Sequence, residues 1–124
     1  MFANNEIGTI EPIAEIGKIA HEHGVLFHTD AVQAYTQVPI DVEAMNIDMM
    51  STSGHKINGP KGIGFLYIRK GVKIKSFIHG GAQERHRRAG TENVTGIIGL
   101  AKAAEIATAN MKERTAEEIK VRDH

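Results

Sequence analysis

The 124-residue chain contains no cysteine and no tryptophan, so it can form neither a disulfide nor a thiolate metal site. Its 15 basic and 15 acidic residues cancel, and this balance argues against binding to nucleic acid or to an anionic membrane surface. No apolar run approaches the roughly 18 residues of a membrane-spanning helix. The N-terminus also lacks the basic and apolar segments of a secretory signal. These absences make the cytoplasm the expected location.

The composition that is present, 41% hydrophobic and 24% charged, is typical of an ordinary globular domain. Apolar spacing and turn residues predict helices at residues 12–23 and about 93–124, and strands at residues 25–29, 47–51 and 62–69. Alternating strands and helices argue for an α/β fold. His21 and His23 point to different faces of the first predicted helix, so we treat both as surface residues and predict no metal site.

The most informative segment is residues 53–62, Ser-Gly-His-Lys-Ile-Asn-Gly-Pro-Lys-Gly, which follows a predicted strand. It places Lys56 in a glycine-rich turn. An ammonium group resists burial unless it is paired or loses its charge, and a Schiff base with a carbonyl cofactor removes that charge. Gly54 leaves space beside Lys56, which we expect to let a cofactor approach the backbone. On Lys56 alone, a solvated loop lysine is the plainer interpretation.

A second feature is Asp30, which ends the strand predicted at residues 25–29. A strand-end aspartate together with a strand-end lysine is the arrangement of a pyridoxal phosphate (PLP) site, where the aspartate faces the pyridinium nitrogen. Asp30 is also a good helix N-cap, and the two roles are compatible. His28 lies on the same face of the strand, where it either reaches the site or belongs to the core.

Four motifs follow one another along the chain. They are Asn-Asn-Glu-Ile-Gly at residues 4–8, His-Thr-Asp-Ala-Val-Gln at 28–33, Ser-Gly-His-Lys at 53–56 and His-Gly-Gly-Ala-Gln-Glu-Arg at 79–85. In this order they closely resemble the NifS-type cysteine desulfurases, which belong to the class V aminotransferase-like group of fold-type I PLP enzymes. The resemblance covers the whole chain. It implies that residues 1–124 are part of a PLP-binding large domain, which has a mainly parallel sheet flanked by helices. Residues from about 93 to 124 would then form the start of a long interdomain helix.

The resemblance also implies a role for each motif residue. Lys56 is the catalytic Schiff-base lysine, and Asp30 pairs with the ring nitrogen of the cofactor. Ser53 and His55 are expected to contact the PLP phosphate. The full set of implied cofactor-binding residues is Asn5, Asp30, Gln33, Ser53, His55, Lys56 and Thr91.

Two of these residues are implied to bind the ring hydroxyl. Gln33 lies three residues after Asp30 and resembles the family glutamine bonded to that oxygen. Asn5 resembles the family asparagine near the same atom. Turn chemistry alone is an equally good account of the asparagine pair at residues 4–5, since asparagine favours turns.

The charged loop at residues 80–90 is implied to lie at a homodimer interface, from which Thr91 reaches the PLP phosphate of the partner subunit. His86 and Ala82 stand where glycine is common in the family. Because glycine permits positive φ, these two substitutions bear on the backbone shape of the loop.

The implied activity is that of a PLP-dependent cysteine desulfurase, which converts L-cysteine to L-alanine and transfers sulfur to a protein persulfide. Iron–sulfur cluster or other sulfur-cofactor assembly, with a sulfur-acceptor or scaffold protein, is the implied context. Lys61 in the Gly-Pro-Lys-Gly turn favours the NifS-like branch. The family's persulfide cysteine, its substrate-carboxylate arginine and its N-terminal phosphate loop have no counterpart here, so we expect an internal fragment that is inactive alone. The alternatives are another class V enzyme, such as a selenocysteine lyase or aminotransferase, and a non-catalytic remnant domain.

Overall fold

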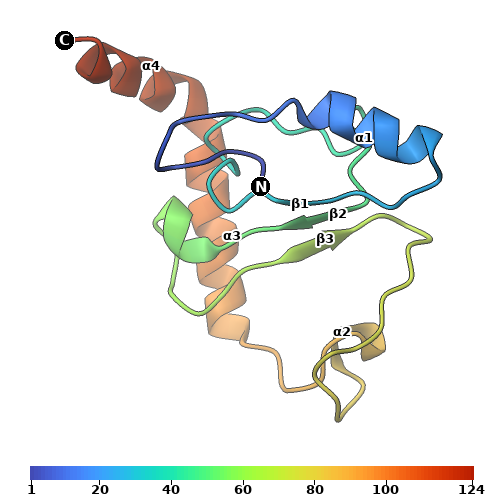
Figure 1. Ribbon diagram of the computed structural model, residues 1–124. Coiled ribbons are helices and arrows are strands. Elements are labelled where there is room, and N and C mark those ends of the chain that lie inside the picture. The colour runs from blue at the N-terminus through green and yellow to red at the C-terminus, as the bar shows by residue number, and fades with distance from the viewer.

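The computed structural model describes residues 1–124 and contains a small sheet with helices around it (Figure 1). The elements in chain order are α1 (Ile13–Glu22), β1 (His28–Asp30), β2 (Met49–Ser51), the 3-10 helix η1 (Gly54–Ile57), β3 (Leu66–Ile68), α2 (Gln83–His86), α3 (Val94–Ala109) and α4 (Met111–Arg122). In Figure 1, α1 lies along one side of the sheet and α4 bends away from the end of α3. None of the helices has the length and apolar character needed to span a bilayer.

α1 has the boundaries that its flanking residues predict, whereas the predicted C-terminal helix is divided in two. α1 follows Pro12 and is followed, after His23, by Gly24 at a φ of +66°, so the predicted helix at residues 12–23 is confirmed. The predicted long helix at about 93–124 is instead two helices, α3 and α4, which meet at Asn110. The Asn110 side chain donates to the carbonyl of Ile106, and this local bond competes with continuation of the helix.

The sheet has the strand order β1-β2-β3. β1 and β2 are parallel, with Asp30 opposite Ser51, whereas β2 and β3 are antiparallel, with Ser51 opposite Leu66. Of the two strand pairings in this chain, one is parallel and one is antiparallel. A parallel neighbour needs a long crossover connection, and the turn through η1 folds the chain directly back instead. The strands are also shorter than predicted, since Val25 and Leu26 are exposed and lie outside β1.

Alternation along the strands divides the sheet into a buried face and an open face. Thr29 and Met50 are in register on the buried face. The core on that side consists of Phe2, Ile13, Ala31, Ala34, Ile47 and Met50. The open face carries His28, Asp30 and Ser51, which are exposed or half-buried. A second cluster of Ile57, Leu100 and Ala107 packs η1 against α3. The core thus holds β1, β2 and η1 in place while their polar residues stay accessible.

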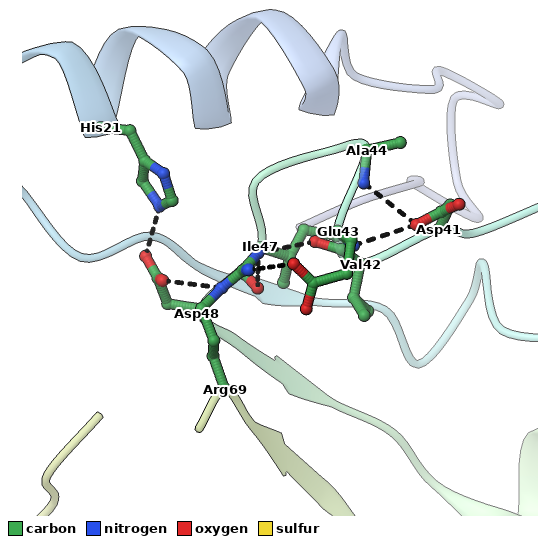
Figure 2. Close-up of polar contacts among 8 residues, drawn as sticks. All are labelled: His21, Asp41, Val42, Glu43, Ala44, Ile47, Asp48 and Arg69. Carbon is green, nitrogen blue, oxygen red and sulfur yellow. Dashed lines mark hydrogen bonds and ion pairs between the residues drawn. The ribbon is translucent and has the colours of Figure 1, made fainter. Parts of the chain in front are cut away.

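A network of charged groups joins α1, β1, β2 and β3 at the end of the sheet where the parallel strands begin (Figure 2). Its centre is Asp48, whose side chain is only 4% exposed. Oδ2 of Asp48 accepts the Phe27 N–H at 2.8 Å and lies 2.8 Å from Nε2 of His21, while Oδ1 lies 3.2 Å from Nε of Arg69. Arg69 also binds the turn at residues 42–47 through the carbonyls of Val42 and Ile47 and the carboxylate of Glu43. His21, expected as an ordinary surface residue, belongs to this network.

The network lowers the pKa of Asp48. Burial acts to raise the pKa, but the Phe27 N–H, His21 and Arg69 favour the carboxylate and leave the pKa below 3.8. For Arg69, burial acts to lower the pKa, and the Glu43 carboxylate outweighs it, so the pKa is raised. Both groups are therefore charged across the physiological range. Because the pKa of Asp48 is lower in the folded chain, its stabilising contribution is present above pH 3.8 and is lost as the pH falls through the folded pKa.

We expect Asp48→Asn to lower the free energy of unfolding at neutral pH by about 3 kcal/mol, since Arg69 loses its buried counter-charge. The substitution should also remove the part of the acid-induced loss of stability that Asp48 causes. Urea denaturation of the parent and variant from neutral pH to below pH 3.8 measures both effects. Asp41→Asn is the matched control, because Asp41 is exposed and caps the turn at Glu43 and Ala44, a role that asparagine fills equally well. Equal stability of parent and Asp48→Asn would contradict the prediction.

Candidate active site at the carboxyl end of the parallel strands

The two parallel strands end side by side, and the motifs at residues 28–33 and 53–56 lie at this end of the sheet, called the site edge below. Asp30 closes β1 and its register partner Ser51 closes β2. The Ala31 N–H donates to the Ser51 carbonyl at 2.9 Å, which extends the pairing beyond the strands. In Figure 1 the green helical turn η1, which carries Lys56, lies directly beyond the end of β2. The fold therefore delivers the aspartate and the lysine to one edge.

Asp30 has one carboxylate oxygen occupied and one available. Its Oδ1 accepts the Val32 N–H at 2.8 Å, so Asp30 caps a turn and not the helix that the sequence suggested. The side chain is exposed, and Oδ2 has no partner within the chain. Gln33 lies half-buried in the turn that Asp30 caps. The backbone carbonyl of Asp30 accepts the Phe2 N–H at 2.7 Å, which holds the N-terminal segment beside β1. An incoming N–H donor can therefore bind Oδ2 without breaking an existing bond.

Ser53, His55 and Lys56 lie at the start and on the outer side of η1. The Ser53 hydroxyl and His55 Nδ1 are 2.6 Å apart, a hydrogen bond that orients both groups. Asn58, at a φ of +61°, ends η1 with its N–H donated to the Gly54 carbonyl. Lys56 is exposed. The burial that the sequence suggested for its ammonium is therefore not found in this chain, and the amine is accessible to a ligand.

The interpretation of Gly54 as space for a cofactor is wrong. Gly54 is buried, and a Cβ there would lie 3.0 Å from Cγ2 of Ile63 and 3.1 Å from the carbonyl of Pro60. Glycine is needed because the chain leaving η1 packs back on its own beginning, where the Gly54 N–H donates to the Ile63 carbonyl at 2.8 Å. The close approach is between two parts of the protein, η1 and the segment that follows it.

Gly64 is also required for close packing between the segment before η1 and the segment after it. A Cβ at Gly64 would lie 2.3 Å from the backbone carbonyl of Thr52, directly before Ser53. We expect Gly64→Ala to push these segments apart and lower the free energy of unfolding by about 2 kcal/mol. It should also weaken cofactor binding, because Ser53 moves. Gly62→Ala is the control: at a φ of +75° with open space around it, it adds about 1 kcal/mol of backbone strain without a clash. Urea denaturation and cofactor titration compare the two, and equal effects would contradict the prediction.

His28 and Ser51 add a polar pair that the sequence did not resolve. The sequence left His28 undecided between site and core, and the structure places it exposed on the open face. Its Nε2 lies 2.7 Å from Oγ of Ser51. Ser51 was not singled out, because its signal is its register with Asp30, which exists only once the strands pair.

Asn5 and Thr91 are not brought to this edge by any contact within the chain. The turn at residues 4–7 is made by Asn4, whose Oδ1 accepts the N–H groups of Glu6 and Ile7. Asn5 is exposed on that turn. Thr91 is exposed and follows the loop that carries α2, which projects away from η1 and the sheet in Figure 1. Within one copy of the chain, Thr91 therefore stands apart from the other residues of the set.

The loop around α2 adopts the positive φ angles that glycine tolerates best. Glu84, Arg85 and His86 have φ values of 50°, 56° and 63°. His86 thus sits in the backbone conformation that explains a preference for glycine at its position. Ala82 has a φ of −90°, so its side chain causes no such strain.

The groups at the site edge fit pyridoxal phosphate by their chemistry. A carboxylate oxygen without a partner suits a protonated ring nitrogen, an exposed amine suits an aldehyde, and a hydroxyl–imidazole pair suits a phosphate. No cluster of three or more histidine, aspartate or glutamate side chains has the geometry of a metal site. The arrangement favours a carbonyl cofactor bound by an amine.

The family model for aminotransferase class-V matches residues 1–124. The chain belongs to this family. It is 66% identical over 123 residues to the cysteine desulfurase IscS of Methanosarcina thermophila. This match covers 99% of the chain and 30% of the relative. It is 55% identical over 124 residues to the cysteine desulfurase IscS of Dictyoglomus turgidum, covering all of the chain and 32% of that relative. The chain thus spans about a third of the length of these relatives.

Solved structures agree with this assignment. A NifS-like protein superposes with a TM-score of 0.94 at 46% identity, covering 99% of this chain and 34% of that one. A structure of SspA in complex with cysteine gives a TM-score of 0.81 at 51% identity, covering 84% of this chain and 30% of that one. The α/β fold and the resemblance to NifS-type cysteine desulfurases are therefore confirmed. Enzymes of the cysteine desulfurase and class V aminotransferase families use pyridoxal phosphate.

Proposed function

We propose that this chain is the cofactor-binding segment of a PLP-dependent cysteine desulfurase, which converts L-cysteine to L-alanine and passes the sulfur to a protein thiol as a persulfide. The observation that carries the proposal is the meeting of Asp30, Ser53 and Lys56 at one sheet edge in a chain 66% identical to a cysteine desulfurase. The structural neighbour in complex with cysteine supports the substrate. The acceptor thiol comes from outside these 124 residues, which contain no cysteine.

In this proposal each residue of the site edge has one task. Oδ2 of Asp30 accepts the N–H of the protonated ring nitrogen and keeps that nitrogen charged. The Ser53–His55 pair binds the phosphate. Nζ of Lys56 would hold the cofactor through its aldehyde and would take up and return protons at the reacting carbon. When bound, pyridoxal phosphate supplies an electron sink for the substrate carbanion.

The remaining residues of the predicted set are proposed from the resemblance. Gln33 and Asn5 bind near the ring hydroxyl. Thr91 binds the phosphate held by the partner subunit of a homodimer, and its position on a loop that projects away from η1 supports this role in another copy (Figure 1). A sulfur-acceptor or scaffold protein, as in iron–sulfur cluster assembly, takes the persulfide sulfur.

The 124-residue chain by itself is expected to show no turnover with L-cysteine and to bind PLP weakly. It lacks the thiol that accepts sulfur, and it exposes large apolar side chains, including Phe77 at 94% and Ile98 at 64%, which favour self-association. Correct positioning of groups supplies roughly 7–11 kcal/mol of barrier reduction, and an incomplete site forgoes most of it. Release of alanine and sulfide with excess PLP and a reductant is the measurement. Multiple turnovers above the background of free PLP, lost in Lys56→Ala, would contradict the expectation.

The proposed function is tested in a chimera in which this chain replaces the matching 123-residue segment of the Methanosarcina thermophila relative. We expect the chimera, as a complete enzyme, to bind PLP and to form alanine from L-cysteine. A chimera that folds and binds PLP but forms no alanine would point to another class V reaction. A folded chimera that fails to bind PLP would overturn the proposal in favour of a non-catalytic segment. The unmodified relative is the control for the assay.

A further inference from the structure

His28 and Ser51 form a pair on the open face for which the proposed function has no role. His28 Nε2 and Ser51 Oγ are 2.7 Å apart, within hydrogen-bond distance. The residues lie on neighbouring parallel strands, and Ser51 is the register partner of Asp30. The pair therefore reaches from the position two residues before Asp30 on β1 to the position directly beside Asp30 on β2.

Folding of the chain does not account for this pair. The core lies on the opposite face, at Thr29 and Met50. His28 is exposed and Ser51 is only half-buried. A typical hydrogen bond contributes about 1 kcal/mol to stability, and a solvated one contributes less. What distinguishes the pair is its place, since His28, Ser51 and Asp30 share one face of two adjacent strands at the site edge.

We propose that His28 is a positioning residue that acts through Ser51 on the carboxylate of Asp30. The proposal rests on the proposed function, in which Oδ2 of Asp30 binds the ring nitrogen. Adjacent strands are about 4.8 Å apart, so the hydroxyl of Ser51 and the carboxylate of Asp30 are neighbours. A hydroxyl has one proton and two lone pairs. When the Nε2–H of His28 donates to Ser51 Oγ, the hydroxyl proton is left to point toward Asp30.

This hydroxyl complements the bond that Asp30 already accepts. Oδ1 of Asp30 is held by the Val32 N–H at 2.8 Å, which fixes one side of the carboxylate. Ser51 Oγ makes no hydrogen bond to Asp30 in this chain, so it acts through the orientation of its hydroxyl dipole, whose positive end faces the other side of the carboxylate and favours the ionised form. An oriented and ionised Asp30 keeps the ring nitrogen protonated. His28 thereby affects the reacting centre without touching it.

The test uses the chimera with His28→Phe or Ser51→Ala. Each variant is expected to lower kcat about tenfold while KM for L-cysteine and Kd for PLP change less than about threefold. The second readout is the NMR signal of isotopically labelled ring nitrogen in bound PLP, which should move toward the unprotonated position in both variants. The double variant should be no worse than either single one, because the two residues act in series.

Two further variants separate this role from a structural one. His28→Gln, which keeps a donor near the Nε2 position, should restore the ring-nitrogen signal and most of kcat. His23→Phe should change nothing, because His23 is exposed and its Nδ1 is bonded to the Ile19 carbonyl within its own helical turn. An unchanged ring-nitrogen signal in both His28→Phe and Ser51→Ala would overturn the proposal, whether or not the thermal midpoint falls. Independent, multiplying effects of the two substitutions would also overturn it.

The unsubstituted chimera keeps this result distinct from the proposed function. If the chimera turns over L-cysteine and the variants behave like it, only the role of His28 is rejected. If the chimera binds no PLP through Lys56, the proposed function fails, and with it the His28 proposal.

Discussion

Lys56→Ala in the chimera is expected to lower the rate of alanine formation about a thousandfold or more, equal to at least about 4 kcal/mol of transition-state stabilisation. Lys56 has two tasks in the proposed reaction, holding the cofactor aldehyde and moving protons at the reacting carbon. Alanine can perform neither. The residue is suited to both because it is exposed on η1, the helical turn that follows β2. PLP should remain detectable through the contacts at Asp30 and Ser53, but it should be released far more easily.

Covalent attachment gives the most direct measurement. Borohydride reduction of the chimera with PLP, followed by peptide mass spectrometry, should place the cofactor on Lys56. Lys61→Ala is the matched control, since Lys61 is an exposed lysine of the same turn, and it should keep both attachment and turnover. Attachment mainly at Lys61, or unchanged PLP binding and turnover in Lys56→Ala, would show that the lysine has been assigned wrongly.

Asp30→Ala is expected to cost about a hundredfold or more in kcat while some PLP binding remains. The ion pair with the ring nitrogen keeps the cofactor an effective electron sink, and an unprotonated ring withdraws electrons less well. The effect should fall mainly on kcat, because the lysine and the phosphate contacts still hold the cofactor. Substitution also removes the acceptor for the Val32 N–H, so part of any loss of stability comes from the turn that Asp30 caps.

Asp41→Ala separates the two consequences of losing Asp30. Asp41 is likewise exposed and likewise accepts backbone N–H groups, from Glu43 and Ala44, but it lies on the turn before β2 begins. Its substitution should lower stability by about 1 kcal/mol and leave kcat unchanged. Steady-state kinetics and urea denaturation of both variants provide the comparison. An Asp30→Ala chimera within a factor of about three of the parent in kcat would mean that Asp30 serves only as a cap.

Some elements were predictable because their causes are local. α1 is preceded by Pro12 and followed within two residues by Gly24, and its buried Ile13 lies on the predicted apolar face, so the helix was placed within a residue at each end. Asp30 and Lys56 were recognised because each ends a strand-like run and belongs to a motif of characteristic order. By contrast, the break at Asn110 depends on a side chain that bonds to its own helix, and the pattern of residues 93–124 read as continuous.

The composition, the motifs and their order were sufficient to determine the family and the α/β class, because residue type and spacing are properties of the chain itself. Only the tertiary structure decided which residues meet. The pairing of β1 with β2 places Ser51 beside Asp30, and packing in space joins His21, Asp48 and Arg69 into one network. The antiparallel return of β3 likewise explains why Gly54 and Gly64 carry no side chain. The physical reason is that register and close packing arise between segments far apart in sequence, where no local propensity specifies the partner.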